Sequence, residues 1–167
     1  MKVKTKELHF TKTENGIQVT DISRQVDHSV IDSRIKDGIV IVHVTSPWLS
    51  ISTMDYEEGN IHDMKSAITK IAKGSSGSSI YGHSLGGFGT AVSYIDHKGK
   101  HLGLPKADGE GNVMHAILGP SITIPIKGNR TMLGKWQQIL LWDAGRKLNE
   151  QARVIVQIIG DFYEDAE

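Results

Sequence analysis

The order of strand-like and helix-like segments constrains the fold of this chain most. Six runs rich in β-branched and aromatic residues have the length of single strands, and they are residues 4–13, 17–22, 39–44, 121–126, 136–142 and 152–159. One long segment, residues 57–73, has helical periodicity instead. Many strands with one principal central helix predict an α+β fold with a mostly antiparallel, twisted β-sheet or sandwich. At 167 residues, the chain is most simply a single domain.

The principal helix is predicted over residues 57–73. Its apolar residues recur at intervals of three or four, which places them on one helix face. They are Ile61, Met64, Ile68 and Ile71. Asp55 and Glu58 have the spacing of a capping box at the start of this helix. Residues 113–118 are short and apolar, and they predict one or two further helical turns.

Turn signals separate the strand runs. Asn15-Gly16 lies between the first two runs. Because both residues tolerate positive φ, this pair predicts a β-hairpin with a type I′ turn. Further turns are expected at residues 127–129 and 143–145, which contain glycine with asparagine or aspartate.

Residues 73–111 are rich in glycine, serine and histidine, with a short strand expected at 90–96. They contain Gly82-His83-Ser84-Leu85-Gly86, which matches the G-x-S-x-G pattern of the α/β-hydrolase nucleophile elbow. That elbow needs a buried strand before the serine and a helix after it. Here a glycine- and serine-rich stretch precedes Ser84, and each glycine after it disfavours a helix by about 1 kcal/mol. We therefore reject the hydrolase interpretation and expect Ser84 to be a loop serine.

Composition excludes several classes of function. Nineteen Lys and Arg residues balance nineteen Asp and Glu residues, so no excess of positive charge indicates nucleic-acid binding. Cysteine is absent, so a metal site would have to use the eight histidines together with carboxylates. We find no signal-peptide core and no run long enough to cross a bilayer. We therefore expect a cytoplasmic protein without a membrane partner.

Four stretches carry a resemblance to a known family. IQVTDISRQVDHSVIDSRIKDGIVIV, residues 17–42, resembles the opening of the small bacterial and archaeal YjbQ-like proteins, which are often labelled secondary thiamine-phosphate synthases. In that opening a strand, an aspartate-initiated turn, a short amphipathic segment and an Ile-Lys-Asp-Gly turn lead into an apolar strand. LGPSITIPI, GKWQQILLWDAG and RVIVQIIG resemble the family's Leu-Gly-Pro-Ser-Leu-Thr-Ile-Pro, Gly-Thr-Trp-Gln and closing Val-Val-Val-Gln-Val-Ile-Gly elements.

This resemblance implies one YjbQ-like domain over residues 1–167, with an insertion loop at about residues 84–107. It implies assembly as a homotrimer, and a polar cluster near loops and the central helix. The activity associated with the family joins the pyrimidine and thiazole-phosphate halves of thiamine. The expected partner is therefore a small-molecule ligand, either a phosphorylated or a heterocyclic metabolite.

The family's site residues match this sequence only in part. Where the family has His-Thr-Thr after the apolar strand, residues 46–48 are Ser-Pro-Trp. His43 lies three residues before Ser46 and on the opposite face, because strand side chains alternate. The family's Asn-Glu-Asn-Glu run matches residues 54–57, which keeps acids at Asp55 and Glu57.

The other matches lie further along the chain. The family's Tyr-x-His matches residues 81–83, and its Glu-Gly-Asn element matches residues 110–112 after the insertion. The histidine that opens the family's short helix aligns without gaps with Asn112. His115 takes that place only if the alignment includes a deletion.

The candidate site residues follow from the resemblance. As catalytic residues we expect His83, Glu57 and Asp55, with His83 as a general acid or base. As substrate-binding residues we expect Ser46, Glu110, Asn112, Trp136 and Gln137, with Trp136 and Gln137 stacking on and hydrogen bonding to a ring. As ligands of a divalent metal, Mg²⁺ or Zn²⁺, we expect His83 and His115.

Alternative interpretations of these residues stay open. Asp55 and Glu57 could cap the principal helix. His115 could be a core histidine with one satisfied hydrogen bond, and Trp136 could pack in the core. Two functions also stay open. One is a thiamine-phosphate-synthase-like transferase, and the other is a non-catalytic ligand-binding or assembly protein that has lost part of the family's histidine set.

Overall fold

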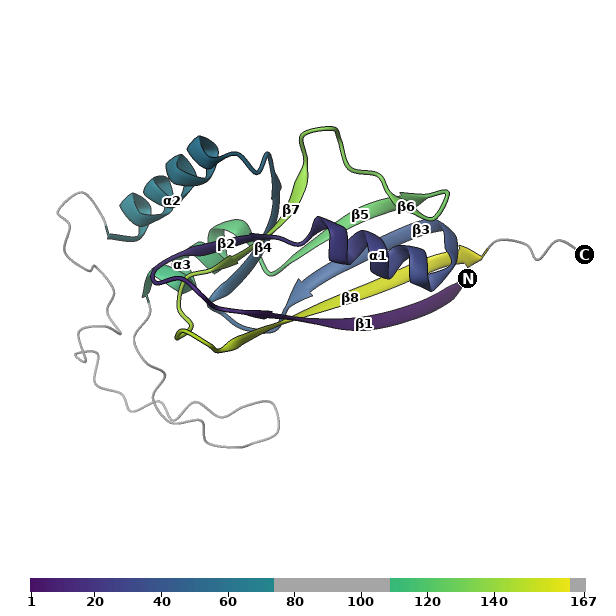
Figure 1. The fold of residues 1–167 in the computed structure, drawn as a ribbon, viewed down its shortest axis with the longest axis horizontal. Coiled ribbons are helices and arrows are strands. Elements are labelled where there is room, and N and C mark those ends of the chain that lie inside the picture. The colour runs from purple at the N-terminus through teal and green to yellow at the C-terminus, as the bar shows by residue number, and fades with distance from the viewer. Residues whose placement is uncertain (74–108, 163–167) are drawn as a thin grey trace, which may run out of the picture.

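A computed structural model gives the fold of the protein and describes residues 1–73 and 109–162 (Figure 1). The elements of this part of the chain are β1 (Lys2–Thr11), β2 (Gln18–Asp21), α1 (Ser23–Ser33), β3 (Ile35–Val44), β4 (Leu49–Met54), α2 (Glu58–Lys73), α3 (Gly109–Leu118), β5 (Ser121–Lys127), β6 (Arg130–Thr131), β7 (Gln138–Asp143) and β8 (Gln151–Phe162). The α+β class is confirmed, and α2 is the longest of its three helices.

The strands form two sheets, in which every pairing between described strands is antiparallel. One sheet has five strands in the order β1-β8-β3-β5-β6, and the other has three in the order β2-β7-β4. The parallel sheet that a nucleophile elbow requires is therefore absent from this part of the chain. Ser84 and the strand expected at 90–96 lie outside the described residues.

Two apolar clusters hold three layers together. The first lies between the five-stranded sheet and a layer formed by α1 and the three-stranded sheet, and it includes Val26, Val42 and Val156. The second joins Trp142, on the other face of β7, to Ile68 of α2 and Met114 of α3. In Figure 1, α1 lies along the long strands, whereas α2 lies at the opposite end from the start of β1 and the end of β8. The helices α2 and α3 therefore cover only the small sheet.

The prediction of a β-hairpin around Asn15-Gly16 is wrong. Gly16 has the positive φ of a turn, at 72°. However, β1 pairs along its whole length with β8, and β2 pairs with β7 in the other sheet. The physical reason is strand length, because the ten residues of β1 find a full set of ladder partners in twelve-residue β8 and not in four-residue β2. The chain thus crosses between sheets at this turn.

Two local expectations are confirmed and one is wrong. The Asp21 carboxylate accepts a hydrogen bond from the Ser23 amide at 2.9 Å, which gives the aspartate-initiated turn before α1. Gly128 and Asn129 both have positive φ and form the two-residue turn between β5 and β6. The Ile-Lys-Asp-Gly stretch at 35–38 is not a turn. It begins β3 with an irregularity in register, because left-handed Arg34 has already ended α1.

Candidate functional site

The expected site residues lie at opposite ends of β4. Asp55 and Glu57 follow its last residue, Met54, whereas Ser46 precedes its first, Leu49. Six residues of strand separate the two ends by about 20 Å at the usual rise per residue. We call these ends the β4–α2 corner and the β3–β4 corner. His83 and the insertion at 84–107 lie outside the described residues.

At the β4–α2 corner, strand pairing brings two distant segments together. Met54 pairs with Gln138 at the start of β7, so the Trp136 and Gln137 segment lies beside the Asp55 and Glu57 segment. The Gln138 side-chain oxygen accepts a hydrogen bond from the Tyr56 amide at 2.9 Å, which fixes the connection from β4 to α2. Four of the expected site residues are therefore neighbours here.

Glu57 acts as the N-terminal cap of α2. Its two carboxylate oxygens accept hydrogen bonds from the amides of Gly59 and Asn60, each at 3.0 Å. These two backbone donors lower the pKa of the exposed Glu57 carboxyl below its usual value. At neutral pH, Glu57 is therefore an ionised hydrogen-bond acceptor, a state that suits ligand binding better than proton donation. The cap is formed by Glu57 rather than by the Asp55 and Glu58 capping box.

Trp136 does not pack in the core. Its side chain is 64% exposed, and the Lys135 ammonium lies 4.7 Å from the centre of a ring of the indole. The Gln137 side-chain oxygen accepts a hydrogen bond from the Gly134 amide at 2.8 Å and so closes the loop before β7. The Trp136 ring is therefore exposed to solvent, its role in stacking on a ligand stays a prediction, and part of the Gln137 amide is already used.

A pocket of about 490 Å³ opens at the N-terminal end of α2. The described residues that line it are Tyr56, Glu57, Glu58, Ile61, His62 and Lys65. This volume falls in the range of small-molecule sites. His62 and Lys65 are three residues apart and so neighbours on the helix surface. The pocket therefore combines an aromatic ring, carboxylates and cationic or titratable nitrogen atoms.

At the β3–β4 corner, His115 joins α3 to the start of β4. Its Nδ1 lies 2.6 Å from the carbonyl oxygen of Leu49. Because a carbonyl oxygen only accepts, Nδ1 carries a proton, so the tautomer that fits this contact has its lone pair on Nε2. The turn before Leu49 is held by the Ser46 hydroxyl, which accepts a hydrogen bond from the Trp48 amide at 3.4 Å. The same His115 bond fits the structural role of a satisfied, half-buried histidine.

Asn112 and Glu110 precede His115 in α3. Asn112 is exposed and lies one helical turn before His115. Asn112 aligns with the family histidine without gaps, and His115 aligns with it only with a deletion. The two residues therefore lie on neighbouring turns of one helix.

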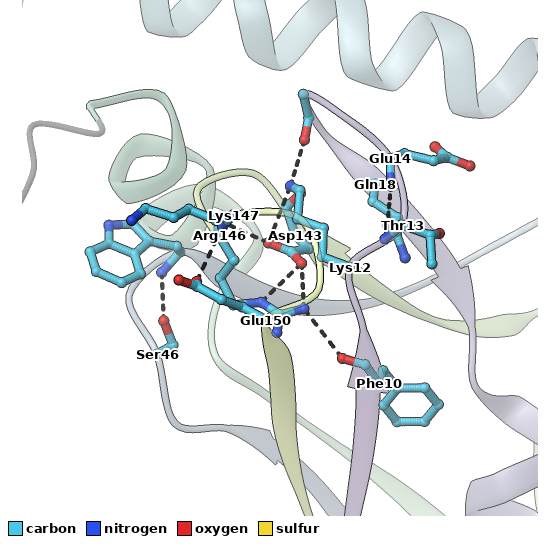
Figure 2. Close-up of polar contacts among 12 residues, drawn as sticks. Phe10, Lys12, Thr13, Glu14, Gln18, Ser46, Asp143, Arg146, Lys147 and Glu150 are labelled. Carbon is cyan, nitrogen blue, oxygen red and sulfur yellow. Dashed lines mark hydrogen bonds and ion pairs between the residues drawn. The ribbon is translucent and has the colours of Figure 1, made fainter.

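A buried charged cluster that sequence reasoning missed lies beside this corner. Figure 2 shows Lys12, Asp143 and Arg146 pointing toward one another from the ends of β1 and β7. Lys12 Nζ lies 3.5 Å from one carboxylate oxygen of Asp143, and Arg146 Nε donates to the other at 2.9 Å. All three side chains are at most 6% exposed. No local signal marked Lys12, because its lysine-rich surroundings are typical of a solvated strand.

The described residues do not by themselves form a metal centre. Among them, no three histidine or acidic side chains converge as they would around an ion. His115 presents one available nitrogen, and the second expected ligand, His83, is outside the described part. The described helices also include none that is long and apolar enough to span a membrane.

Comparison with protein families gives one match over most of the chain. A family model described as UPF0047 protein YjbQ-like matches residues 6–161. No curated protein matches the chain.

Solved structures share the fold. A YbjQ-like protein of unknown function from Sulfolobus solfataricus P2 aligns with a TM-score of 0.75 and 22% identity, covering 96% of this chain and 99% of that one. A hypothetical protein from Aeropyrum pernix K1 gives 0.71 and 20% identity, with 95% and 99% covered. An uncharacterised conserved protein of the YjbQ/UPF0047 family from Clostridium acetobutylicum gives 0.65 and 21% identity, with 92% and 98% covered.

Proposed function

Starting from the finding that the chain belongs to the YjbQ-like (UPF0047) family, we propose that it binds a small phosphorylated or heterocyclic metabolite at the β4–α2 corner. The pocket of about 490 Å³ at the start of α2 is the observation that supports this proposal. Lys65 and His62 are the groups suited to an anionic phosphate. The Tyr56 ring and the Ile61 side chain suit the flat faces of a heterocycle. Glu57 would accept hydrogen bonds from its amino groups.

The finer proposal is a thiamine-phosphate-synthase-like transfer, which rests on the resemblance to the family. In that reaction, cationic donors would stabilise the departing pyrophosphate, while an acid and His83 position the reacting groups. Trp136, which is exposed at the β4–α2 corner, would stack on the ring of the acceptor or donor.

The non-catalytic alternative is favoured by one observation. The Glu57 carboxylate is occupied by two backbone donors and its pKa is lowered, which makes it a weak general base. A protein that only binds its ligand in this pocket does not need a general base, and so it does not need a raised pKa at Glu57. The two functions differ in turnover and not in binding.

Thermal-shift measurements with inorganic phosphate, the aminopyrimidine precursor and the thiazole phosphate test binding. We expect each ligand that binds to raise the thermal midpoint. Lys65→Ala should lower the apparent affinity for that ligand at least tenfold. Lys70→Ala is the matched control, because Lys70 lies on the same helix outside this pocket. Absence of any shift with all three probes would overturn the proposed site.

Turnover assays with the same precursors separate enzyme from binding protein. Glu57→Gln keeps one of the two acceptor oxygens of the cap and removes the charge. For a transferase, product formation should be lost in Glu57→Gln and His83→Ala while the thermal midpoint stays close to wild type. Ligand stabilisation without any product in the wild-type protein would support the binding function.

We also propose that the chain forms a homotrimer in the cytoplasm. Val3 and Ile39 are 53% and 37% exposed on the face of the five-stranded sheet that no described element covers. An exposed apolar patch of this kind is typical of an interface. Sedimentation velocity should give three times the chain mass, and Val3→Lys should reduce the assembly, whereas Lys4→Glu on the other face should not. A monomer at 100 µM would refute this assembly.

A further inference from the structure

A groove separates β4 from β5 where the two sheets diverge. β4 is the outermost strand of the small sheet, and β6 covers only the last two residues of β5. The groove has a volume of about 330 Å³. Its described lining residues are Thr53, Ile122, Thr123, Ile124, Pro125, Met132, Leu133 and Gln137. Both walls are therefore sheet edges, and the loop before β7 closes the far side.

The backbone directions of the β5 wall follow from one hydrogen bond. The Pro125 carbonyl accepts from the Met132 amide at 2.9 Å, so it points away from β3. Because successive residues of an antiparallel strand direct their backbone groups to alternate sides, the N–H and C=O of Thr123 also point away from β3 and into the groove. Within the described residues these groups have no hydrogen-bond partner.

The β4 wall repeats this arrangement. The Ile51 amide donates to the Gly119 carbonyl at 3.1 Å, on the side away from β7. By the same alternation, the N–H and C=O of Thr53 point away from β7 and toward the groove, again without a partner in the part of the chain that the structure describes. Two edges thus present the donor and acceptor pairs that an added strand would use.

Exposed side chains surround the mouth of the groove. Met132 is 54% and Trp136 is 64% exposed, which is unusual for side chains of this size. Lys127, the last residue of β5, and Lys135, in the loop before β7, are exposed, and Asp55 lies two residues after Thr53 of β4. Among the charged residues next to the lining segments, lysines therefore outnumber carboxylates.

We propose that this groove binds an extended, acidic peptide segment of another protein by strand addition to β5. Backbone recognition needs donors and acceptors at the spacing of a strand, which the free edge at Thr123 supplies. Met132 and Leu133 of the lining provide apolar contact for alternate side chains, and the lysines select acidic residues. The groove shares no described lining residue with the pocket at the start of α2 and does not depend on the function proposed for that pocket.

The test uses the full chain and a fluorescein-labelled, N-acetylated and C-amidated Val-Glu-Val-Glu-Val-Glu peptide in fluorescence anisotropy. We expect saturable binding, and at least tenfold weaker binding of the same peptide with Lys in place of Glu. Thr123→Pro removes the outward N–H without removing a hydrogen bond to β3, and it should weaken binding at least tenfold. Thr123→Ala keeps the N–H and should bind within twofold of wild type.

The charge contribution is tested by Lys127→Glu with Lys135→Glu, which should also weaken binding at least tenfold. This double variant decides the matter if Thr123→Pro does not fold, as judged by circular dichroism. The proposal would be overturned by any of three results: no saturable binding, equal binding by wild type, Thr123→Pro and the double lysine variant, or tighter binding of the Lys peptide. Sedimentation velocity provides a second measurement. If Thr123→Pro converts an oligomer of the wild-type chain into monomers, a second copy occupies the groove and the proposal fails.

Discussion

Lys12 and Asp143 are 131 residues apart in the chain, yet the Lys12 ammonium lies 2.9 Å from the Asp143 carbonyl oxygen and 3.5 Å from its carboxylate. Lys12 follows β1, where the chain leaves the five-stranded sheet, and Asp143 ends β7, where the chain is about to return to it. Arg146 binds the same carboxylate and also reaches the Phe10 carbonyl at 3.4 Å (Figure 2). One carboxylate therefore ties together two of the connections between the sheets, from β1 to β2 and from β7 to β8.

Replacing Asp143 should destabilise the protein more than replacing Lys12. Asp143→Asn leaves two buried cations without their counter-charge, for which we expect a loss of about 3–5 kcal/mol in the free energy of unfolding. Lys12→Met keeps the Arg146 pair and should cost less. Urea denaturation measures both, with Lys6→Met, which removes an exposed ion pair, as a control near zero. Equal losses for Asp143→Asn and Lys6→Met would show that the cluster does not hold the sheets together.

Gly38→Ala should destabilise the five-stranded sheet strongly. Gly38 faces Gly160 across β3 and β8, and a Cβ on Gly38 would lie 2.1 Å from the Ile159 carbonyl oxygen. Backbone must move to relieve this clash, and we expect a loss of about 3 kcal/mol or an insoluble protein. Gly16→Asn is the matched control, because a Cβ there meets nothing within 4 Å and asparagine tolerates the positive φ. Similar denaturation midpoints for the two variants would contradict this explanation.

Asp27 should make stability depend on pH below neutrality. Partial burial by itself would raise its pKa, but hydrogen bonds from Thr131 and Arg130 outweigh burial and lower the pKa below the usual value. A folded-state pKa below the unfolded value of about 4 stabilises the fold above pH 4, and this stabilisation is lost as the pH falls through the folded-state pKa. Asp27→Asn should therefore lower the unfolding free energy at pH 7 by about 1 kcal/mol.

The same variant should approach wild-type stability as the pH falls through the lowered pKa of Asp27, where the wild-type carboxyl becomes protonated. Urea titrations at pH 7, 5 and 3 measure the difference. A difference that is constant across these pH values would refute the assigned role of the carboxylate.

His115 should be found as the Nδ1–H tautomer at neutral pH. The Leu49 carbonyl at 2.6 Å from Nδ1 requires a donor, so the ring is expected to keep its proton there. Nitrogen chemical shifts from heteronuclear NMR distinguish the two tautomers directly. His115→Asn places an amide N–H near the position of Nδ1 and should retain stability, whereas His115→Phe leaves the carbonyl unpaired and should cost about 1–2 kcal/mol. An Nε2–H tautomer would exclude this hydrogen bond.

The sequence located most elements but not their partners. The periodicity of residues 57–73 predicted α2, and the apolar runs predicted β3, β5, β7 and β8 to within a few residues. The positive φ values of Gly16, Gly128 and Asn129 were also predictable, because they depend on residue type and immediate neighbours. Helix α1 was visible only as the amphipathic segment of the family resemblance.

Sequence reasoning brought the candidate residues together as one site, and the structure divides them. Asp55, Glu57, Trp136 and Gln137 meet because Met54 pairs with Gln138, a contact between residues far apart in sequence. Ser46 and His115 lie at the other end of β4. The pocket-lining His62 and Lys65 were missed, although their spacing on the predicted helix was available as a signal.

What the sequence alone determined is the local conformation of each run and the α+β class, because side-chain periodicity and turn residues act over a few neighbouring positions. The tertiary structure alone decided that β1 pairs with β8 instead of β2, and that Lys12 is buried against Asp143. The first outcome depends on which distant strand offers β1 the longer hydrogen-bonded ladder. The second depends on which distant residue offers Lys12 an opposite charge. That choice is made by the whole folded chain, since backbone hydrogen bonding and charge burial are satisfied across all layers at once.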